Sequence, residues 1–138
     1  MVAEKKYADV LQPGTHASTF GGSPIVCVAA LAVFEAIKKE RLLQNTRKMG
    51  DYLRGLLLSL KDKYQFISEV RGIGLMLGVE LAMEGAAVAQ KAIENGLLIN
   101  CTHDKVLRIM PPLGVTKQEI DKAIKILDEV LYKCKREI

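Results

Sequence analysis

The chain is organised around residues 14–24, which read Gly14-Thr-His-Ala-Ser-Thr-Phe-Gly-Gly-Ser-Pro24. Hydroxyl side chains at Ser18, Thr19 and Ser23 offer hydrogen-bond donors, and the glycines let the backbone approach a ligand closely. Pro24 suits the first turn of a helix, and the amino-terminal end of a helix is the positive end of its dipole. These features predict an anion-binding loop at the start of a helix.

The helix that follows the loop is expected from Pro24 to about Glu40, with Ser23 as its N-cap. Residues 25–34 are apolar on every side of this helix instead of forming one stripe. A helix of this kind must be surrounded, and a small domain covers only one or two of its faces. The run is too short to span a bilayer. It therefore predicts a subunit partner or a further part of the same protein.

The rest of the chain alternates between helical and extended patterns. We expect helices at about 42–61, at 84–95 and from Thr116 onward, and strands at 65–71, 75–81, 97–101 and 106–110. Gly96 is placed to end the middle helix in a left-handed conformation, and Thr116 and Glu119 form a capping box. The fold class is α/β of the α+β type, with a small, mostly antiparallel sheet packed on one side by helices.

Finer features of these elements are also readable. Turns are expected at Gln12–Gly14 and Thr102–Lys105, a turn or bulge at Gly72–Gly74, and a short helical stretch around Glu4–Ala8. The stripe that the helix at 42–61 buries is expected to contain Leu42, Thr46, Met49, Leu53, Leu56 and Leu60. In the last helix we expect Ile120, Ile124, Leu127, Leu131 and Cys134 to share one side.

The composition is that of a soluble globular domain, with 138 residues, 49% hydrophobic residues and 26% charged residues. The net charge is +4, and much of the excess lies on the exteriors of expected helices without interleaved aromatic residues. We interpret these charges as a solvated surface and expect no nucleic-acid partner. No segment has the form of a signal peptide or a membrane span, so we expect a cytoplasmic protein without a membrane partner.

Cysteine and histidine do not form a recognisable metal site. Cys27, Cys101 and Cys134 lack metal-ligand spacing and lie in apolar contexts, so we expect buried thiols in a reducing compartment. His16 and His103 have no Cys, Asp or Glu at useful spacing and are interpreted as polar loop residues. We expect no metal.

Three segments resemble one known family. The segment His16-Ala-Ser-Thr-Phe-Gly-Gly-Ser-Pro24 resembles the His-x-Ser-Thr-Phe-Gly-Gly-Asn-Pro signature of the class III pyridoxal-phosphate aminotransferases, with Ser23 in the place of asparagine. The segment Val70-Arg-Gly-Ile-Gly-Leu-Met76 is similar to the family's Arg-Gly-x-Gly-Leu, and Leu107-Arg-Ile-Met-Pro-Pro-Leu113 is similar to its Arg-x-x-Pro-Pro-Leu. The resemblance covers nearly the whole chain.

The resemblance implies a fold and a reaction. The implied fold is the carboxyl-terminal domain of pyridoxal-phosphate transferases of the aspartate aminotransferase fold, with residues 1–23 ending the large domain and residues 24–138 forming the small domain. The similarity is greatest to the acetylornithine group, which transfers an amino group from N-acetylornithine to 2-oxoglutarate in arginine biosynthesis. The complete enzyme is expected to bind small amino-acid and 2-oxo-acid substrates as a homodimer.

The resemblance also implies roles for individual residues. Thr19 is expected to hydrogen-bond the cofactor phosphate held by the other subunit, Ser18 to lie beside the substrate, and Arg108 to bind its α-carboxylate. From the strand pattern alone, Arg108 lies among apolar neighbours, where a guanidinium needs an anionic partner unless its head reaches water. Ser18 and Thr19 would alternatively cap local backbone groups. Arg71 is expected only to pair with a nearby acid.

No lysine in this chain has the context of the one that binds the cofactor covalently, and the resemblance places that lysine upstream. We therefore expect no catalytic residue here, and a chain that is inactive alone. Two alternatives remain open. One is another class III aminotransferase, acting on ornithine, succinylornithine or 4-aminobutyrate. The other is a non-catalytic α+β module that associates with itself through the apolar helix.

Overall fold

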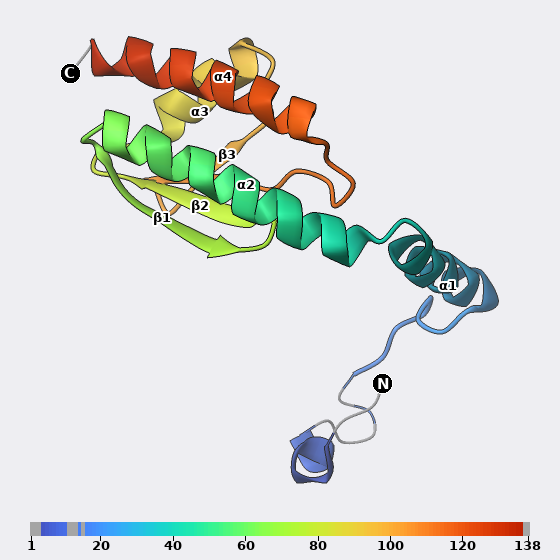
Figure 1. Cartoon of the computed structure of the whole chain (residues 1–138). Helices are drawn as coiled ribbons and strands as arrows, with labels where there is room; N and C mark the ends of the chain where they lie inside the picture. Colours follow the sequence, from blue (N-terminus) through green and yellow to red (C-terminus); the bar gives the residue numbers. More distant parts are fainter. Residues whose placement is uncertain (1–3, 11–13, 15, 137–138) are drawn as a thin grey trace. The chain divides into compact units, whose positions relative to one another are not determined.

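A computed structural model describes residues 4–10, 14 and 16–136 of the chain. The chain divides into two compact units, residues 1–36 and residues 37–138, which are described separately. The first unit contains the 3₁₀-helix η1 (Lys5–Val10) and most of helix α1 (Pro24–Lys39). Figure 1 shows both units, coloured along the sequence. The expected short helical stretch is confirmed as η1, whereas Gln12 and Pro13 of the first expected turn lie outside the described residues.

Helix α1 begins where its sequence predicts. The carbonyl oxygen of Ser23 accepts the first intrahelical hydrogen bond from the amide of Cys27, at 2.9 Å. None of the α1 residues is buried, and Ile25 is 80% exposed. Cys27 is exposed as well, so the expectation of a buried thiol at this position is wrong. Its apolar context reflects the exposed apolar helix around it.

The second unit contains a four-stranded antiparallel sheet with the strand order β1-β2-β4-β3. Its strands are β1 (Ile67–Ile73), β2 (Met76–Leu81), β3 (Asn100–Thr102) and β4 (Val106–Ile109). The expected fold class is therefore confirmed. One expected turn is shifted, because Gly72 and Ile73 continue β1 and pair with Leu77 and Met76. The turn itself consists of Gly74 and Leu75.

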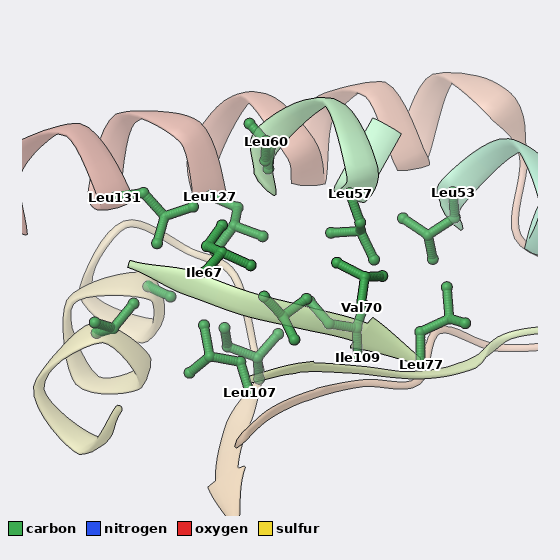
Figure 2. Close-up of a cluster of buried hydrophobic side chains, with 14 of the residues drawn as sticks. Leu53, Leu57, Leu60, Ile67, Val70, Leu77, Leu107, Ile109, Leu127 and Leu131 are labelled. Atoms are coloured by element: carbon green, nitrogen blue, oxygen red, sulfur yellow. The ribbon is translucent and has the colours of Figure 1, made fainter. Parts of the chain in front are cut away.

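Three helices accompany the sheet: α2 (Leu42–Lys63), α3 (Ala86–Glu94) and α4 (Lys117–Lys135). Helix α2 lies against β1 and β2, α3 lies against β3, and α4 packs against both other helices. Figure 2 shows leucine, isoleucine and valine side chains filling the space between these helices and one sheet face. We call this the inner face and the opposite one the outer face.

The core agrees with the expected stripes in part, since Leu42 and Thr46 of the α2 stripe are only half-buried. Met49, Leu53 and Leu60 of α2 are buried as expected, but Leu57 is 1% exposed and Leu56 only half-buried. The helix thus turns a slightly different face to the sheet. In α4, Ile120, Leu127, Val130, Leu131 and Cys134 are buried, and Ile124 is half-buried.

Local capping signals are confirmed in this unit. Gly96 has φ 86, and the amide of Leu97 donates to the carbonyl of Ala92, which closes the end of α3. Thr116 and Glu119 form the capping box of α4. Within the part of the chain that the structure describes, no helix is long and apolar enough to cross a membrane.

Candidate functional site

The loop that precedes α1 is shaped by a side-chain contact of Ser18. The amide of Gly21 donates a hydrogen bond to the Ser18 Oγ at 3.0 Å. A Cβ at Gly21 would lie 2.9 Å from that oxygen, so glycine is needed for this close contact. The Ser18 hydroxyl therefore accepts a hydrogen bond from the local backbone. This is the alternative role, capping of backbone groups, that the sequence offered for this residue. Its O–H remains a donor toward a ligand.

Thr19 lies beside this contact and is exposed. Among the residues that the structure describes, none hydrogen-bonds with its hydroxyl group. Gly22 has φ 78, and a Cβ built on it would meet no atom within 4 Å, so the backbone near Thr19 is open to solvent. A hydroxyl donor on an open glycine loop suits a phosphate oxygen. The loop therefore offers an anion one hydroxyl donor without a partner among the described residues.

The second candidate group lies in the other unit, on the outer face of the sheet. Residues that pair directly across antiparallel strands share one face. Arg71 of β1 pairs with Gly78 of β2, Gly78 pairs with Arg108 of β4, and Arg108 pairs with Asn100 of β3. These residues form one row across all the strands, which we call the arginine row.

Arg71 is neutralised within this row. Its Nη1 donates to the Glu69 carboxylate at 2.7 Å and to the Glu80 carboxylate. Hydrogen bonding to Glu80, and then to Glu69, raises the pKa of Arg71 above its ordinary value. The expectation that Arg71 pairs with a nearby acid is confirmed, and its charge is already compensated.

Arg108 has a different environment. Its Nε donates to the amide oxygen Oδ1 of Asn100 at 3.1 Å, and no carboxylate contacts it among residues 4–10, 14 and 16–136. Leu107 and Ile109 are buried, but Arg108 itself is exposed. The cost of a buried charge therefore does not apply in this chain, which matches the alternative in which the arginine head reaches water. Unlike Arg71, Arg108 forms no ion pair with an acid of the described residues.

The arginine row borders a hollow in the outer face. The hollow has a volume of about 330 Å³ and is lined by residues that include Arg71, Met76, Gly78, Val106 and Arg108. Gly78 contributes no side chain between the two arginines, and a Cβ there would lie 3.1 Å from the Val106 Cγ1. A second hollow, of about 420 Å³, lies on the other side of Arg108 beside Asn100 and Leu98.

Sequence reasoning missed Asn100 and Gly78 as members of this site. A polar residue in the otherwise apolar run from Leu97 to Cys101 was a signal that Asn100 faces away from the core. Its pairing with Arg108 depends on the loop between β3 and β4, because Thr102 pairs with Val106 and not with Lys105. The sequence predicts the bounds of this turn only approximately, so it does not determine the register between β3 and β4.

Comparisons with known proteins match most of the chain. The family model described as Aminotransferase class-III matches residues 1–131. The acetylornithine aminotransferase of Caldanaerobacter subterraneus subsp. tengcongensis is 46% identical over 131 residues, covering 94% of this chain and 33% of the relative. That of Methanocaldococcus jannaschii is 46% identical over 138 residues, covering 99% of this chain and 34% of the relative. The chain thus spans about a third of the length of these relatives.

Solved structures resemble the chain in the same way. The ornithine aminotransferase of Toxoplasma gondii ME49 superposes with a TM-score of 0.83 at 36% identity, covering 94% of this chain and 32% of that one. The acetylornithine aminotransferase of Elizabethkingia anophelis gives a TM-score of 0.81 at 32% identity, covering 91% of this chain and 34% of that one. Both superpositions cover most of this chain.

Proposed function

Because this chain belongs to the class III aminotransferases, we propose that it is the carboxyl-terminal part of an acetylornithine-type enzyme. That enzyme transfers the side-chain amino group of N-acetylornithine to 2-oxoglutarate in arginine biosynthesis. The names of the relatives at 46% identity support this donor. The observation that carries the chemistry is that no acid among the described residues pairs with Arg108. Its charge is therefore free to bind a substrate carboxylate.

The roles of the loop residues follow from their hydrogen-bonding capacity. Class III aminotransferases use pyridoxal phosphate, which belongs to the complete enzyme and acts as an electron sink for the amino acid. The Thr19 hydroxyl group donates a hydrogen bond to a phosphate oxygen of this cofactor. Ser18 keeps its O–H available beside the substrate, while its oxygen accepts from Gly21. Arg108 holds the substrate by its carboxylate.

The proposal divides the chain by function. Residues 1–23 end the large domain and carry the phosphate loop, and residues 24–138 form the small domain. The Schiff-base lysine belongs to the remaining two-thirds of the enzyme, so the chain alone does not catalyse the reaction. The complete enzyme is a cytoplasmic homodimer, and the exposed apolar side chains of α1 are in keeping with such an assembly.

A chimera tests the function. The chain replaces the corresponding third of the Caldanaerobacter relative, and transamination of N-acetylornithine and 2-oxoglutarate is measured. We expect an active, cofactor-binding chimera whose activity is lost on Arg108→Ala. A folded chimera that binds pyridoxal phosphate but does not transaminate would contradict the proposal.

The amino donor needs a separate comparison, because solved ornithine aminotransferases also resemble the chain. The same chimera is assayed with ornithine and with 4-aminobutyrate at equal concentrations. A higher kcat/KM for either than for N-acetylornithine would assign the chain to another branch of the family. The isolated chain, mixed with pyridoxal phosphate and reduced with borohydride, is expected to give no stoichiometric adduct on one lysine.

A further inference from the structure

The contact between Arg108 and Asn100 restricts how the guanidinium group can act. Asn100 lies on the edge strand β3, directly opposite Arg108 in the sheet, and its side chain is exposed. Its Oδ1 accepts the Nε–H of Arg108 at 3.1 Å. Backbone pairing fixes the two Cα atoms relative to each other, so the side-chain contact joins neighbours that the fold already places side by side.

A guanidinium group offers a carboxylate two different edges. One edge presents Nε–H together with one terminal nitrogen, and the other presents the two terminal nitrogens. Asn100 occupies the Nε–H of Arg108, and no described residue hydrogen-bonds its terminal nitrogens. A carboxylate that binds Arg108 through two parallel hydrogen bonds must then use the terminal edge.

Hollows border Arg108 on both sides, and the one on the Asn100 side has Asn100 itself in its wall. Asn100 stands on one side of the arginine, whereas Gly78 on the other side has no side chain and borders the hollow of about 330 Å³. Glu69 and Glu80, on the strands next to the row, are both ion-paired with Arg71. An anion in the hollow therefore meets the uncompensated charge of Arg108.

We propose that Asn100 is a positioning residue, which holds the Arg108 guanidinium by its Nε edge and directs its terminal edge toward a substrate carboxylate in the hollow beside Gly78. The proposal rests on the proposed role of Arg108. An arginine side chain has several rotatable bonds, and ordering it costs part of the binding free energy. The hydrogen bond to Asn100 orders the Arg108 side chain before the substrate binds.

The test uses the 138-residue chain labelled with ¹⁵N. The Nε–Hε resonance of Arg108 is assigned by its disappearance in Arg108→Lys, and its exchange with water is measured without ligand. Glutarate, an unreactive dicarboxylate, is then titrated, with glutaramide as the neutral comparison. In Asn100→Leu we expect Nε–Hε exchange to be about fivefold faster, because the hydrogen bond is lost. Glutarate binding should be about threefold to tenfold weaker.

Two further variants separate orientation from charge and from unrelated effects. Asn100→Asp keeps an acceptor for Nε–Hε, so exchange stays slow, but its added charge weakens glutarate binding in a salt-dependent way. Asn95→Leu is the matched control, since Asn95 is an exposed asparagine whose side chain, among the described residues, hydrogen-bonds the carbonyl of Lys91 on its own helix at 2.7 Å. It should change neither measurement.

Each outcome decides a specific point. Equal glutarate affinity in Asn100→Leu and Asn95→Leu would overturn the positioning role, whatever the exchange rates. Unchanged Nε–Hε exchange in Asn100→Leu would show that the contact does not orient Arg108. If the unsubstituted chain bound glutarate no better than glutaramide, the carboxylate-binding role of Arg108 itself would be wrong, while the exchange rates would still report on the contact with Asn100.

Discussion

Gly50 of α2 and Gly74 of the β1–β2 turn are in direct backbone contact, since a Cβ on Gly50 would lie 2.4 Å from the Gly74 carbonyl oxygen. Gly50 is buried, although it lies in the middle of a helix, where glycine is unfavourable. Its lack of a side chain lets the helix approach the turn of the hairpin that carries Arg71 and Gly78. The contact therefore helps to fix the sheet under α2.

The Gly50→Ala variant is expected to lose about 1–3 kcal/mol of unfolding free energy, because the added methyl group must displace the turn. Gly55→Ala on the same helix is the control, since a Cβ there would meet no atom within 4 Å. Removing a helical glycine at that position should stabilise the chain by about 1 kcal/mol. Urea unfolding followed by circular dichroism gives both values, and changes of the same sign would contradict the contact.

Tyr64 anchors the end of α2 to α4. Its side chain is 1% exposed, and its hydroxyl bonds Asp128 at the backbone oxygen, 3.0 Å, and at Oδ1, 2.7 Å. Tyr64→Phe should cost about 1–2 kcal/mol of unfolding free energy, because the acceptors lose their buried donor. Tyr132→Phe, at a tyrosine of α4 that is 54% exposed, should change it little. Similar losses in both variants would argue against the anchor.

Acid should weaken the same junction. Burial alone would raise the pKa of Asp128, but hydrogen bonds from Lys63 and Tyr64 outweigh it and lower that pKa below its ordinary value. A depressed pKa contributes stability that is present above the unfolded-state pKa of about 3.9 and is lost as pH falls through the lower, folded value. Asp128→Asn should therefore lose less stability between neutral and strongly acidic pH than the unsubstituted chain. Asp62→Asn, at an exposed position of α2, provides the comparison, and identical pH profiles for the two variants would refute the assignment.

The amino-terminal cap of α4 is a further test of local structure. The Thr116 Oγ1 accepts from the amide of Glu119 at 3.3 Å, and the Glu119 carboxylate accepts from the amide of Thr116 at 2.8 Å. Thr116→Ala should cost about 1 kcal/mol of unfolding free energy, whereas Thr116→Ser should retain most of it. Equal stabilities of the two variants would show that the box contributes nothing measurable.

Thr19 is tested in the chimera described above. Thr19→Val keeps the shape of the side chain but removes the donor to the cofactor phosphate. We expect pyridoxal phosphate to bind about tenfold or more weakly, which corresponds to the loss of a hydrogen bond to a charged group. Thr19→Ser should restore most of the affinity in an absorbance titration. If Thr19→Val bound the cofactor as tightly as the unsubstituted chimera, the phosphate assignment would be wrong.

The elements of this fold were readable because their signals are local. Ser23 and Pro24 define the start of α1, Gly96 ends α3, and Thr116 with Glu119 begins α4, each through the backbone groups of neighbouring residues. Apolar spacing also predicted one sheet face covered by helices. The family was indicated by the loop at residues 14–24 and by the two later segments that contain Arg71 and Arg108. The resemblance then named Ser18, Thr19 and Arg108 as candidates.

Errors arose where the outcome depended on distant packing. The burial of Leu57 in place of Leu56 follows from the angle at which α2 meets the sheet, and a helical period of 3.6 residues leaves both positions near the stripe. Arg108 was expected to lie among apolar neighbours, with an anionic partner unless its head reaches water. It is exposed in the described chain, because those neighbours face the helices and Arg108 faces the opposite side.

The sequence by itself determined the kinds of elements, their caps and the residues able to bind anions, since these depend on backbone propensities and side-chain chemistry within a few residues. Only the tertiary structure decided the strand order β1-β2-β4-β3 and the register that aligns Arg71, Gly78, Arg108 and Asn100. A shift of one residue in any of these pairings would send the side chains of one strand to the other face of the sheet. The arginine row therefore exists only because the core on the inner face fixes the register.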